Sequence, residues 1–148
     1  MKREETFVYV TYIATTPDRV WQALTEGELT RQYWKHENVS DWSPGSTWQH
    51  VADNAERTVR LVGNVVESVP NKRLVLTWGD AAEATDTTKH SRVTIDIETV
   101  DDMVRLTVTH DDLKPASDML RKITNGWPRV LSSLKSFLET GKPLNTWA

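Results

Sequence analysis

"MLRKITNGWPRVLSSLKSFLETGKP", residues 119–143, combines a helical repeat of apolar residues with a string that usually breaks helices. At about 100° per residue, the apolar side chains fall within one arc that covers less than half of the circumference. Polar side chains such as Arg129, Lys135 and Glu139 lie opposite. The sequence therefore predicts one apolar helix face, made of Met119, Leu120, Ile123, Trp127, Val130, Leu131, Leu134, Phe137 and Leu138.

Gly126 and Pro128 interrupt this pattern. Inside a helix, Pro128 removes a backbone donor and crowds the carbonyl of Thr124, at a cost of about 3 kcal/mol, and Gly126 adds about 1 kcal/mol. Local signals leave two alternatives, a single bent helix or two helices with Pro128 starting the second. The register continues unbroken across the string, which favours the single bent helix. Gly126 falls at the edge of the apolar arc, where the missing side chain leaves space.

Composition limits the classes of protein to consider. A chain of 148 residues predicts a single domain, residues 1–148. The net charge is −3, and basic residues are scattered, so we expect neither nucleic acid nor membrane as a partner. The absence of cysteine excludes disulfides, thiolate nucleophiles and cysteine-zinc sites. The opening "MKREET" has no signal-peptide core, and no stretch is apolar enough to span a bilayer, so we expect a cytoplasmic protein.

The first third of the chain predicts a strand followed by two short helices. Residues 6–15, "TFVYVTYIAT", alternate, and because both faces are fairly apolar we expect burial on each. Thr16 and Pro17 are typical of a helix start, and Gly27 is expected to end that helix before "ELTRQYW" forms the second. Farther on, "SPGS" predicts a turn between short strands that carry Trp42 and Trp48.

The middle of the chain predicts an antiparallel sheet. A strand is expected over residues 57–69, where Gly63 marks a bulge or a close approach, with a hairpin turn at "PNK". "SRVTIDIETV" and "MVRLTVTHDDL" alternate most cleanly, which indicates a sheet with one solvated face. The dry face must be covered, and the final helix, expected to open at Pro115, is the one predicted element long enough to cover it.

Several stretches resemble the Activator of Hsp90 ATPase homologue 1-like family of the START-like, Bet v 1-like (SRPBCC) superfamily. "IATTPDRVWQALTEGELTRQYW" is similar to the family's opening "I.A.pe.VW.AlT.pe.l..Ww", and "VGNVVESVPNKRLVLTW" to "G.V.E..PpkrLvytW". "SRVTIDIETVDDMVRLTVTHDDL" and "ITNGWPRVLSSLKSFLETG" resemble the later segments, the last with its "GW…L..L..yLE.G" signature. The resemblance implies an α+β helix-grip fold: a curved antiparallel sheet wrapped around a long C-terminal helix, with two short helices after the first strand. It also implies a cavity for an apolar ligand between helix and sheet.

Tryptophan is abundant, with seven residues, and large rigid rings suit a ligand cavity as well as a core. The polar loop over residues 80–90 is placed to act as a lid. His110 is in phase with the apolar residues of its strand, as either a structural histidine or a weak candidate acid/base, with Arg60 or Arg105 as partners. The predicted ligand-binding residues are Trp34, Trp48, Leu61, Trp78, Val108, His110, Met119, Ile123, Gly126 and Trp127.

Other polar residues form no recognisable site. His36, His50 and His90 lack metal-ligand spacing and are expected in loops or edges, so no metal is predicted. The pairs Asp101–Asp102 and Asp111–Asp112 fall at expected turns. No cofactor motif is present.

Three functions compete on the sequence alone. The first is non-catalytic binding of a small apolar or amphipathic molecule in the cavity. The second, implied by the resemblance, is an Hsp90-type ATPase co-chaperone or stress-response protein, although the chain has no counterpart to the separate N-terminal domain of the eukaryotic activators or its "NxNNWHW" motif. The third is a cyclase- or dehydratase-like enzyme that uses the same cavity. The sequence does not identify the ligand or the oligomeric state, and a homodimer is one of the states it allows.

Overall fold

The computed structural model describes residues 5–144. In chain order the elements are β1 (Glu5–Ile13), α1 (Pro17–Thr25), α2 (Gly27–Trp34), β2 (His36–Ser40), β3 (Thr47–Ala52), β4 (Val59–Val69), β5 (Arg73–Asp80), β6 (Ser91–Val100), β7 (Met103–Leu113) and α3 (Asp118–Thr140), with two short 3-10 turns, η1 (Ala81–Glu83) and η2 (Thr87–Lys89), between β5 and β6.

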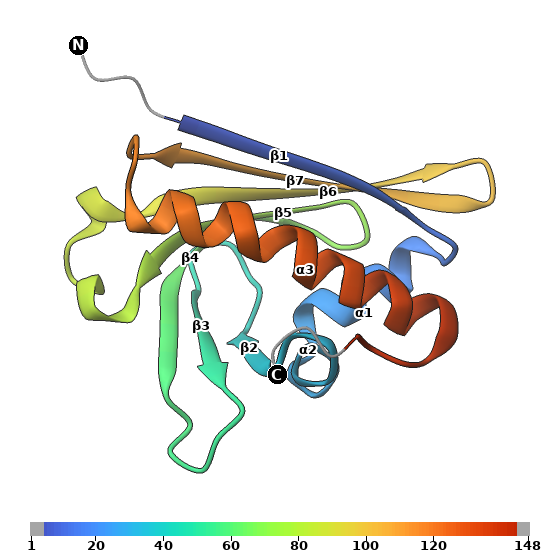
Figure 1. Cartoon of the computed structure of the whole chain (residues 1–148), viewed down its shortest axis with the longest axis horizontal. Helices are drawn as coiled ribbons and strands as arrows, with labels where there is room; N and C mark the ends of the chain where they lie inside the picture. Colours follow the sequence, from blue (N-terminus) through green and yellow to red (C-terminus); the bar gives the residue numbers. More distant parts are fainter. Residues whose placement is uncertain (1–4, 145–148) are drawn as a thin grey trace.

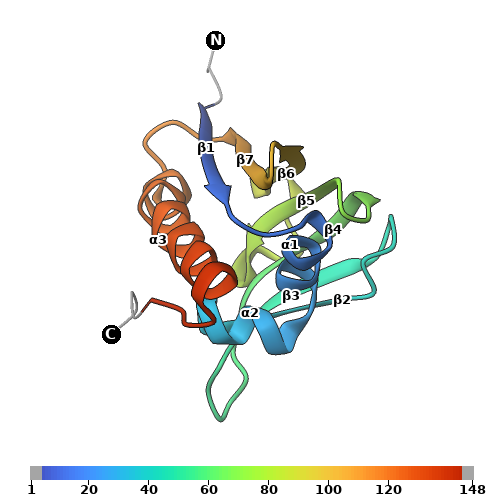
Figure 2. The ribbon, with the colours of Figure 1, turned by 90° about the vertical axis from the view of Figure 1, so that its right-hand side faces the viewer.

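The seven strands form one sheet in the order β1-β7-β6-β5-β4-β3-β2, and every neighbouring pair is antiparallel. The sheet curves around α3, and α1 and α2 lie at one end of that helix (Figure 1; Figure 2). Apolar side chains from the inner face of the sheet and from all three helices form one core. The predicted α+β helix-grip fold, with two short helices after the first strand, is confirmed.

The C-terminal stretch forms one continuous helix, with Pro128 inside it. The helix begins at Asp118 rather than at Pro115, because the side-chain oxygen of Ser117 accepts a hydrogen bond from the backbone N–H of Leu120 and so caps the helix start. Gly141 ends it with a left-handed φ of 82°. The alternative of two helices separated at Pro128 is therefore wrong.

The expectation that β1 is buried on both faces is also wrong. Val8, Val10 and Tyr12 are exposed by 54%, 45% and 42% of their surface. Only the opposite face of β1, which carries Phe7 and Ile13, packs against the core. The helices cover one side of the sheet, so the outer side chains of β1 have no layer above them.

Three boundaries differ from the sequence-based prediction. β4 begins at Val59, because Arg57 adopts a φ of 50° in the preceding turn. Trp42 lies beyond the end of β2 with a φ of 61° and is not in a strand. Gly27 begins α2 instead of ending α1. Each difference falls in a segment where turn geometry overrides side-chain pattern.

Gly63 is a place of close approach, as predicted. The indole nitrogen of Trp48 donates a hydrogen bond of 2.7 Å to the carbonyl of Thr77, across the backbone of Gly63. A Cβ atom at this position would lie 1.8 Å from that carbonyl oxygen and 2.4 Å from the indole nitrogen. A side chain at residue 63 would therefore force β4 away from β5.

Two glycine substitutions are expected to act in opposite directions. Gly63→Ala should lower the free energy of unfolding by about 2 kcal/mol or more, since backbone must move to admit the methyl group. Gly126→Ala should raise it by about 1 kcal/mol, because a Cβ there meets no atom within 4 Å and alanine favours helix. Urea denaturation of both variants beside the parent measures the difference. Equal changes in the free energy of unfolding would contradict the conclusion that Gly63 is tightly packed while Gly126 borders open space.

Candidate functional site

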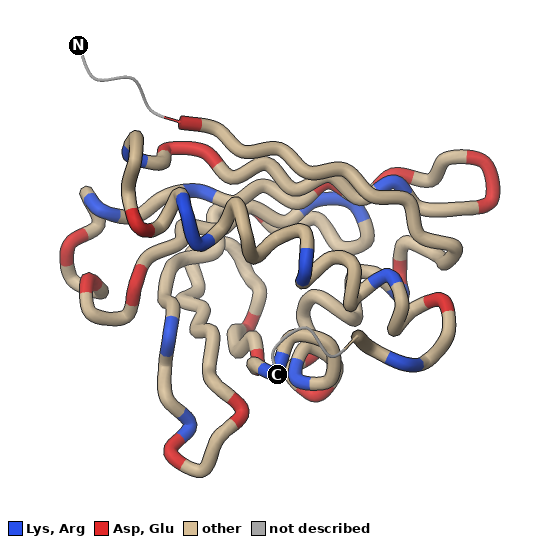
Figure 3. Tube along the Cα trace, in the orientation of Figure 1, with Lys and Arg blue, Asp and Glu red and all other residues tan. Residues whose placement is uncertain are grey.

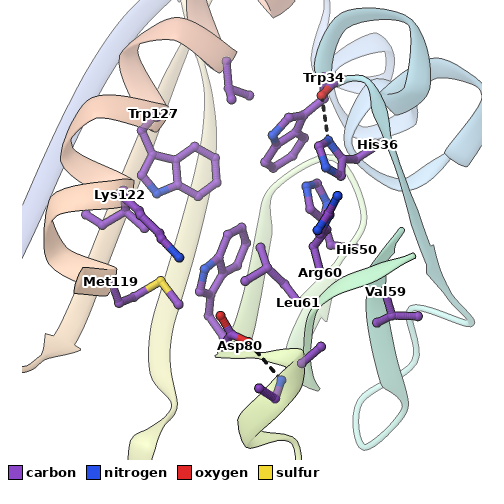
Figure 4. A pocket seen from close by; sticks show the side chains of 16 residues that line it. Trp34, His36, His50, Val59, Arg60, Leu61, Asp80, Met119, Lys122 and Trp127 are labelled. Atoms are coloured by element: carbon purple, nitrogen blue, oxygen red, sulfur yellow. Dashed lines mark hydrogen bonds between the residues drawn. The ribbon is translucent and has the colours of Figure 1, made fainter. Parts of the chain in front are cut away.

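A cavity of about 610 Å³ lies between α3 and the sheet. It falls in the size range of small-molecule sites. Its wall comes from the end of α2, from β2 to β5, from η1 and from the first half of α3 (Figure 4). The residues are Trp34, His36, His50, Val59, Arg60, Leu61, Trp78, Asp80, Ala81, Ala82, Met119, Lys122, Ile123, Gly126, Trp127 and Val130.

Three indoles form the deep part of the wall. Trp127 on α3 lies with its ring centroid 5.5 Å from that of Trp34 and 5.4 Å from that of Trp78. These separations and the tilted ring planes are those of favourable aromatic pairs. The three rings are buried and belong to the core cluster, so the cavity wall is rigid on this side. The Nε1–H of Trp78 is buried without an acceptor among residues 5–144, and it is one unsatisfied donor in the wall.

Two histidines stack at the other side of the cavity. The rings of His36 and His50 are nearly parallel, with centroids 4.4 Å apart and an interplanar angle of 8°. His36 Nδ1 lies 2.9 Å from the carbonyl of Trp34, and His50 Nδ1 lies 2.6 Å from Oδ1 of Asn38. Asn38 in turn donates from Nδ2 to the carbonyl of Leu24. Because a carbonyl oxygen only accepts, each histidine donates from Nδ1 and offers Nε2 as an acceptor when neutral.

His50 stays neutral near pH 7. Burial lowers its pKa well below the ordinary histidine value, and the neighbouring His36 lowers it further. The imidazole of His50 is therefore an uncharged hydrogen-bonding group of the wall, held in one tautomer by Asn38.

Charged side chains stand where the cavity opens. Arg60 extends from β4 and Lys122 from α3, and both point toward the cavity (Figure 4). The carboxylate of Asp80 accepts a hydrogen bond of 2.9 Å from the backbone N–H of Ala82, which starts the η1 turn. Ala81 and Ala82 of this turn belong to the wall, so the start of the residue 80–90 loop closes one end of the cavity.

His110 lies behind this wall and is fully buried, with 0% of its surface exposed. The Nε1–H of Trp127 donates to His110 Nδ1 over 3.1 Å. His110 Nε2 therefore donates to the hydroxyl of Ser91, 2.7 Å away, and that hydroxyl donates to the carbonyl of Trp78. The chain of bonds joins α3 to β7, β6 and β5.

This network favours the structural alternative for His110. Burial lowers the pKa of the imidazole to about 4. Both ring nitrogens are bonded inside the protein, and the residue does not belong to the cavity wall, so it acts by orienting the indole of Trp127. Arg105, the other suggested partner, forms an ion pair with Glu98 on the solvated face of the sheet.

The structure brings together most of the predicted ligand-binding residues. The cavity wall contains Trp34, Leu61, Trp78, Met119, Ile123, Gly126 and Trp127. Trp48, Val108 and His110 lie outside the wall and are buried in the core or the network behind it. Strand phase placed Val108 and His110 on the inner face, and Trp48 was chosen as a large ring in a short strand, but neither signal tells whether another side chain covers the residue. Contact of any of these residues with a ligand stays a prediction.

The sequence did not single out the histidine pair. His36 lies in β2, at the edge of the sheet as one of the two predicted contexts has it, and His50 lies in β3 next to it. Trp48 and His50 are two residues apart, which is the spacing of a strand face. Turns interrupt this segment, however, so its strand pattern is weak. Lys122 was also missed, because on the helix it lies at the border of the apolar arc.

The part of the chain that the structure describes holds no group of three or more histidine, aspartate or glutamate side chains that could bind a metal ion. Within residues 5–144 no helix is both long and apolar enough to cross a bilayer. Acidic and basic residues are interspersed over the part of the chain that is drawn in colour, residues 5–144 (Figure 3).

Comparison with known proteins agrees with this architecture. The model of the family described as Activator of Hsp90 ATPase homolog 1-like protein matches residues 14–139. The chain belongs to this family. A comparison with curated proteins gives no match.

Solved structures similar to this family member share its fold. The Aha1 dimer from Colwellia psychrerythraea is 21% identical with a TM-score of 0.76, and the match covers 93% of this chain and 98% of that one. A protein from Mesorhizobium loti is 25% identical with a TM-score of 0.75, over 90% and 96% of the two chains. An HSP90 activator from Plasmodium falciparum is 20% identical with a TM-score of 0.73, over 90% and 95%.

Because His50 and His110 are buried, we expect the free energy of unfolding to fall in mild acid. The unfolded chain binds a proton on each histidine near pH 6.5, whereas folded His110 resists protonation down to about pH 4. Between these values the unfolded state binds more protons, so the free energy of unfolding must fall as the pH falls. His110 alone accounts for about 3 kcal/mol over this window, and His50 acts in the same direction.

Urea denaturation between pH 7 and pH 5 measures this slope, above the range in which most carboxylates titrate. His110→Gln should lower the stability at pH 7 and flatten the slope. Asn125→Gln, at an exposed position of α3, changes no titrating group, so it is the control and should leave the slope unchanged. An unaltered slope in His110→Gln would contradict the assignment.

Proposed function

We propose that this family member binds a small apolar or amphipathic molecule, without catalysis, in the cavity between α3 and the sheet. The observation that carries the proposal is the cavity itself, which is bordered by three indoles at the place where α3 lacks a side chain. Apolar walls with a few fixed polar groups are typical of ligand sites. A cytoplasmic location and a role in stress response stay predictions.

Gly126 connects the sequence to the cavity. It belongs to the wall, and a Cβ atom there would meet no other atom within 4 Å. Glycine is unfavourable in the interior of a helix by about 1 kcal/mol relative to alanine. A side chain at this position would stabilise the helix but occupy the space beside Trp127, which supports a role in keeping the cavity open.

The hydrogen bonds of the histidines argue against catalysis, both at His110 behind the wall and in the wall itself. That imidazole is sealed behind Trp127, and both of its nitrogens have partners. The rings of His50 and His36 are stacked, and within residues 5–144 no carboxylate is bonded to either ring. The wall offers acceptors and donors for orienting a ligand rather than an activated nucleophile.

A larger side chain in the cavity should weaken binding without unfolding the protein. Gly126→Leu is expected to weaken binding of N-phenyl-1-naphthylamine, an uncharged fluorescent probe, by at least about tenfold, because the new side chain displaces the probe. Asn125→Leu, at an exposed neighbouring position outside the wall, is the matched control and should bind as the parent does. Fluorescence titration measures both, and thermal denaturation checks the fold. Equal probe binding by the two variants, or none by the parent, would refute the proposal.

A second candidate is stimulation of an Hsp90-type ATPase, supported by membership in the family. One similar structure is described as a dimer, and the exposed apolar face of β1 gives a homodimer a surface to use.

The ATPase rate of the host's Hsp90 should rise in proportion to added protein if the co-chaperone candidate holds. Analytical ultracentrifugation of the same sample gives the oligomeric state. An unchanged rate at saturating protein excludes the co-chaperone function.

A further inference from the structure

Two basic side chains stand at the mouth of the cavity. Arg60 and Lys122 approach the cavity from opposite walls (Figure 4), yet neither forms an ion pair within residues 5–144. On the outer face of the sheet, by contrast, Arg73 pairs with Asp96 and Arg92 pairs with Asp111. Both side chains are exposed, and two cations that flank one opening without an ion pair attract an anion to it.

Arg60 and Lys122 outnumber Asp80, the one acid in the wall. Asp80 makes no ion pair with Arg60 or Lys122, and its Oδ1 is engaged by the backbone N–H of Ala82 in the η1 turn. The imidazole of His50 adds no positive charge at neutral pH, because burial keeps it unprotonated. The positive character of the mouth therefore comes from the arginine and the lysine, and a ligand anion can approach both.

The interior of the cavity favours an aromatic group, whereas its mouth favours an anion. Trp34, Trp78 and Trp127 pack against one another at centroid separations of 5.4 to 6.5 Å and present ring faces and edges to the interior from one side. The His50 ring lies 4.6 Å from Trp34 and extends the aromatic wall. Aromatic rings gain from stacked and edge-to-face contacts beyond the burial of their area, which a straight alkyl chain does not.

We propose that the ligand of this cavity is a small aromatic carboxylate, whose ring lies against the three indoles and whose carboxylate lies at the mouth between Arg60 and Lys122. The inference rests on the proposed function, namely that the cavity holds a ligand. Arg60 then binds the carboxylate through its planar guanidinium, and Lys122 closes over it from α3 as a point charge. The apolar floor and the cationic mouth together fix the orientation of the ligand.

Calorimetric titration with 2-naphthoate tests the inference against two matched compounds. 2-Naphthamide has the same ring and shape without the charge, and a straight-chain carboxylate with the same number of carbon atoms keeps the charge without the ring. The parent protein should bind 2-naphthoate about tenfold more tightly than either compound, a ratio that corresponds to the loss of one charge-assisted bond or a pair of aromatic contacts.

Charge-neutral variants locate the anion. Arg60→Gln and Lys122→Gln should each weaken binding of 2-naphthoate by about five- to tenfold, and neither should change binding of 2-naphthamide. Lys72→Gln, in the turn between β4 and β5, removes a positive charge far from the cavity and should bind both compounds as the parent does.

The outcomes separate this inference from the proposed function. If the uncharged fluorescent probe binds but 2-naphthoate and 2-naphthamide bind equally, the cavity holds ligands and the anionic class is wrong. Tighter binding of the straight-chain carboxylate than of 2-naphthoate would overturn the aromatic class. If neither the probe nor any of the three compounds binds, the proposed function fails together with the inference.

Discussion

The contact between the apolar face of α3 and the concave face of the sheet is the constraint on which the rest of the structure depends. An antiparallel sheet with one solvated face must bury the other. Within residues 5–144, α3 is the longest helix and crosses the sheet along its length (Figure 1). It also fastens to the edge of the sheet, because Lys135 donates to the carbonyl of Tyr12 and Glu139 accepts from the backbone N–H of Ala14.

The cavity exists because α3 packs closely against the sheet along its second half and leaves space along its first half. Toward its C-terminal end, Leu131, Leu134 and Leu138 are buried in the core. In its first half, Gly126 presents no side chain, and Met119 and Ile123 border open space instead of closing it. The hydrogen bond from Trp127 to His110 then holds the indole in place at the border between the packed and the open part. A neutral, fully bonded histidine suits this role, since protonation in so dry a site is costly.

Family membership and local chemistry answer different questions here. The match over residues 14–139 and the similar structures establish the helix-grip architecture. They do not choose a ligand, because sequence identities of 18 to 25% preserve the fold rather than the contents of a cavity. The stacked histidines, the three indoles and the two cations at the mouth are the features of this chain that bear on its ligand.

The sequence by itself determined the elements whose pattern is strictly periodic. The alternation in β6 and β7, the turn at Pro70–Lys72 and the continuous apolar register of α3 all follow from residue spacing, because a strand repeats every two residues and a helix about every 3.6. The prediction that Gly126 marks open space beside the helix also came from that register. The wall residues on α3, such as Ile123 and Trp127, were predicted for the same reason, and Trp78 was predicted from the alternation in β5.

Only the tertiary structure decided what lies against each of these elements. It exposed Val8 and Val10 on β1, because a curved sheet covered by helices on one side leaves its outer face bare. It stacked His36 on His50, since two short strands with weak patterns meet only when the sheet is assembled. Arg60 and Lys122 came to one opening for the same reason: a residue's spacing along the chain fixes its face, whereas its neighbours across a cavity depend on how distant elements pack.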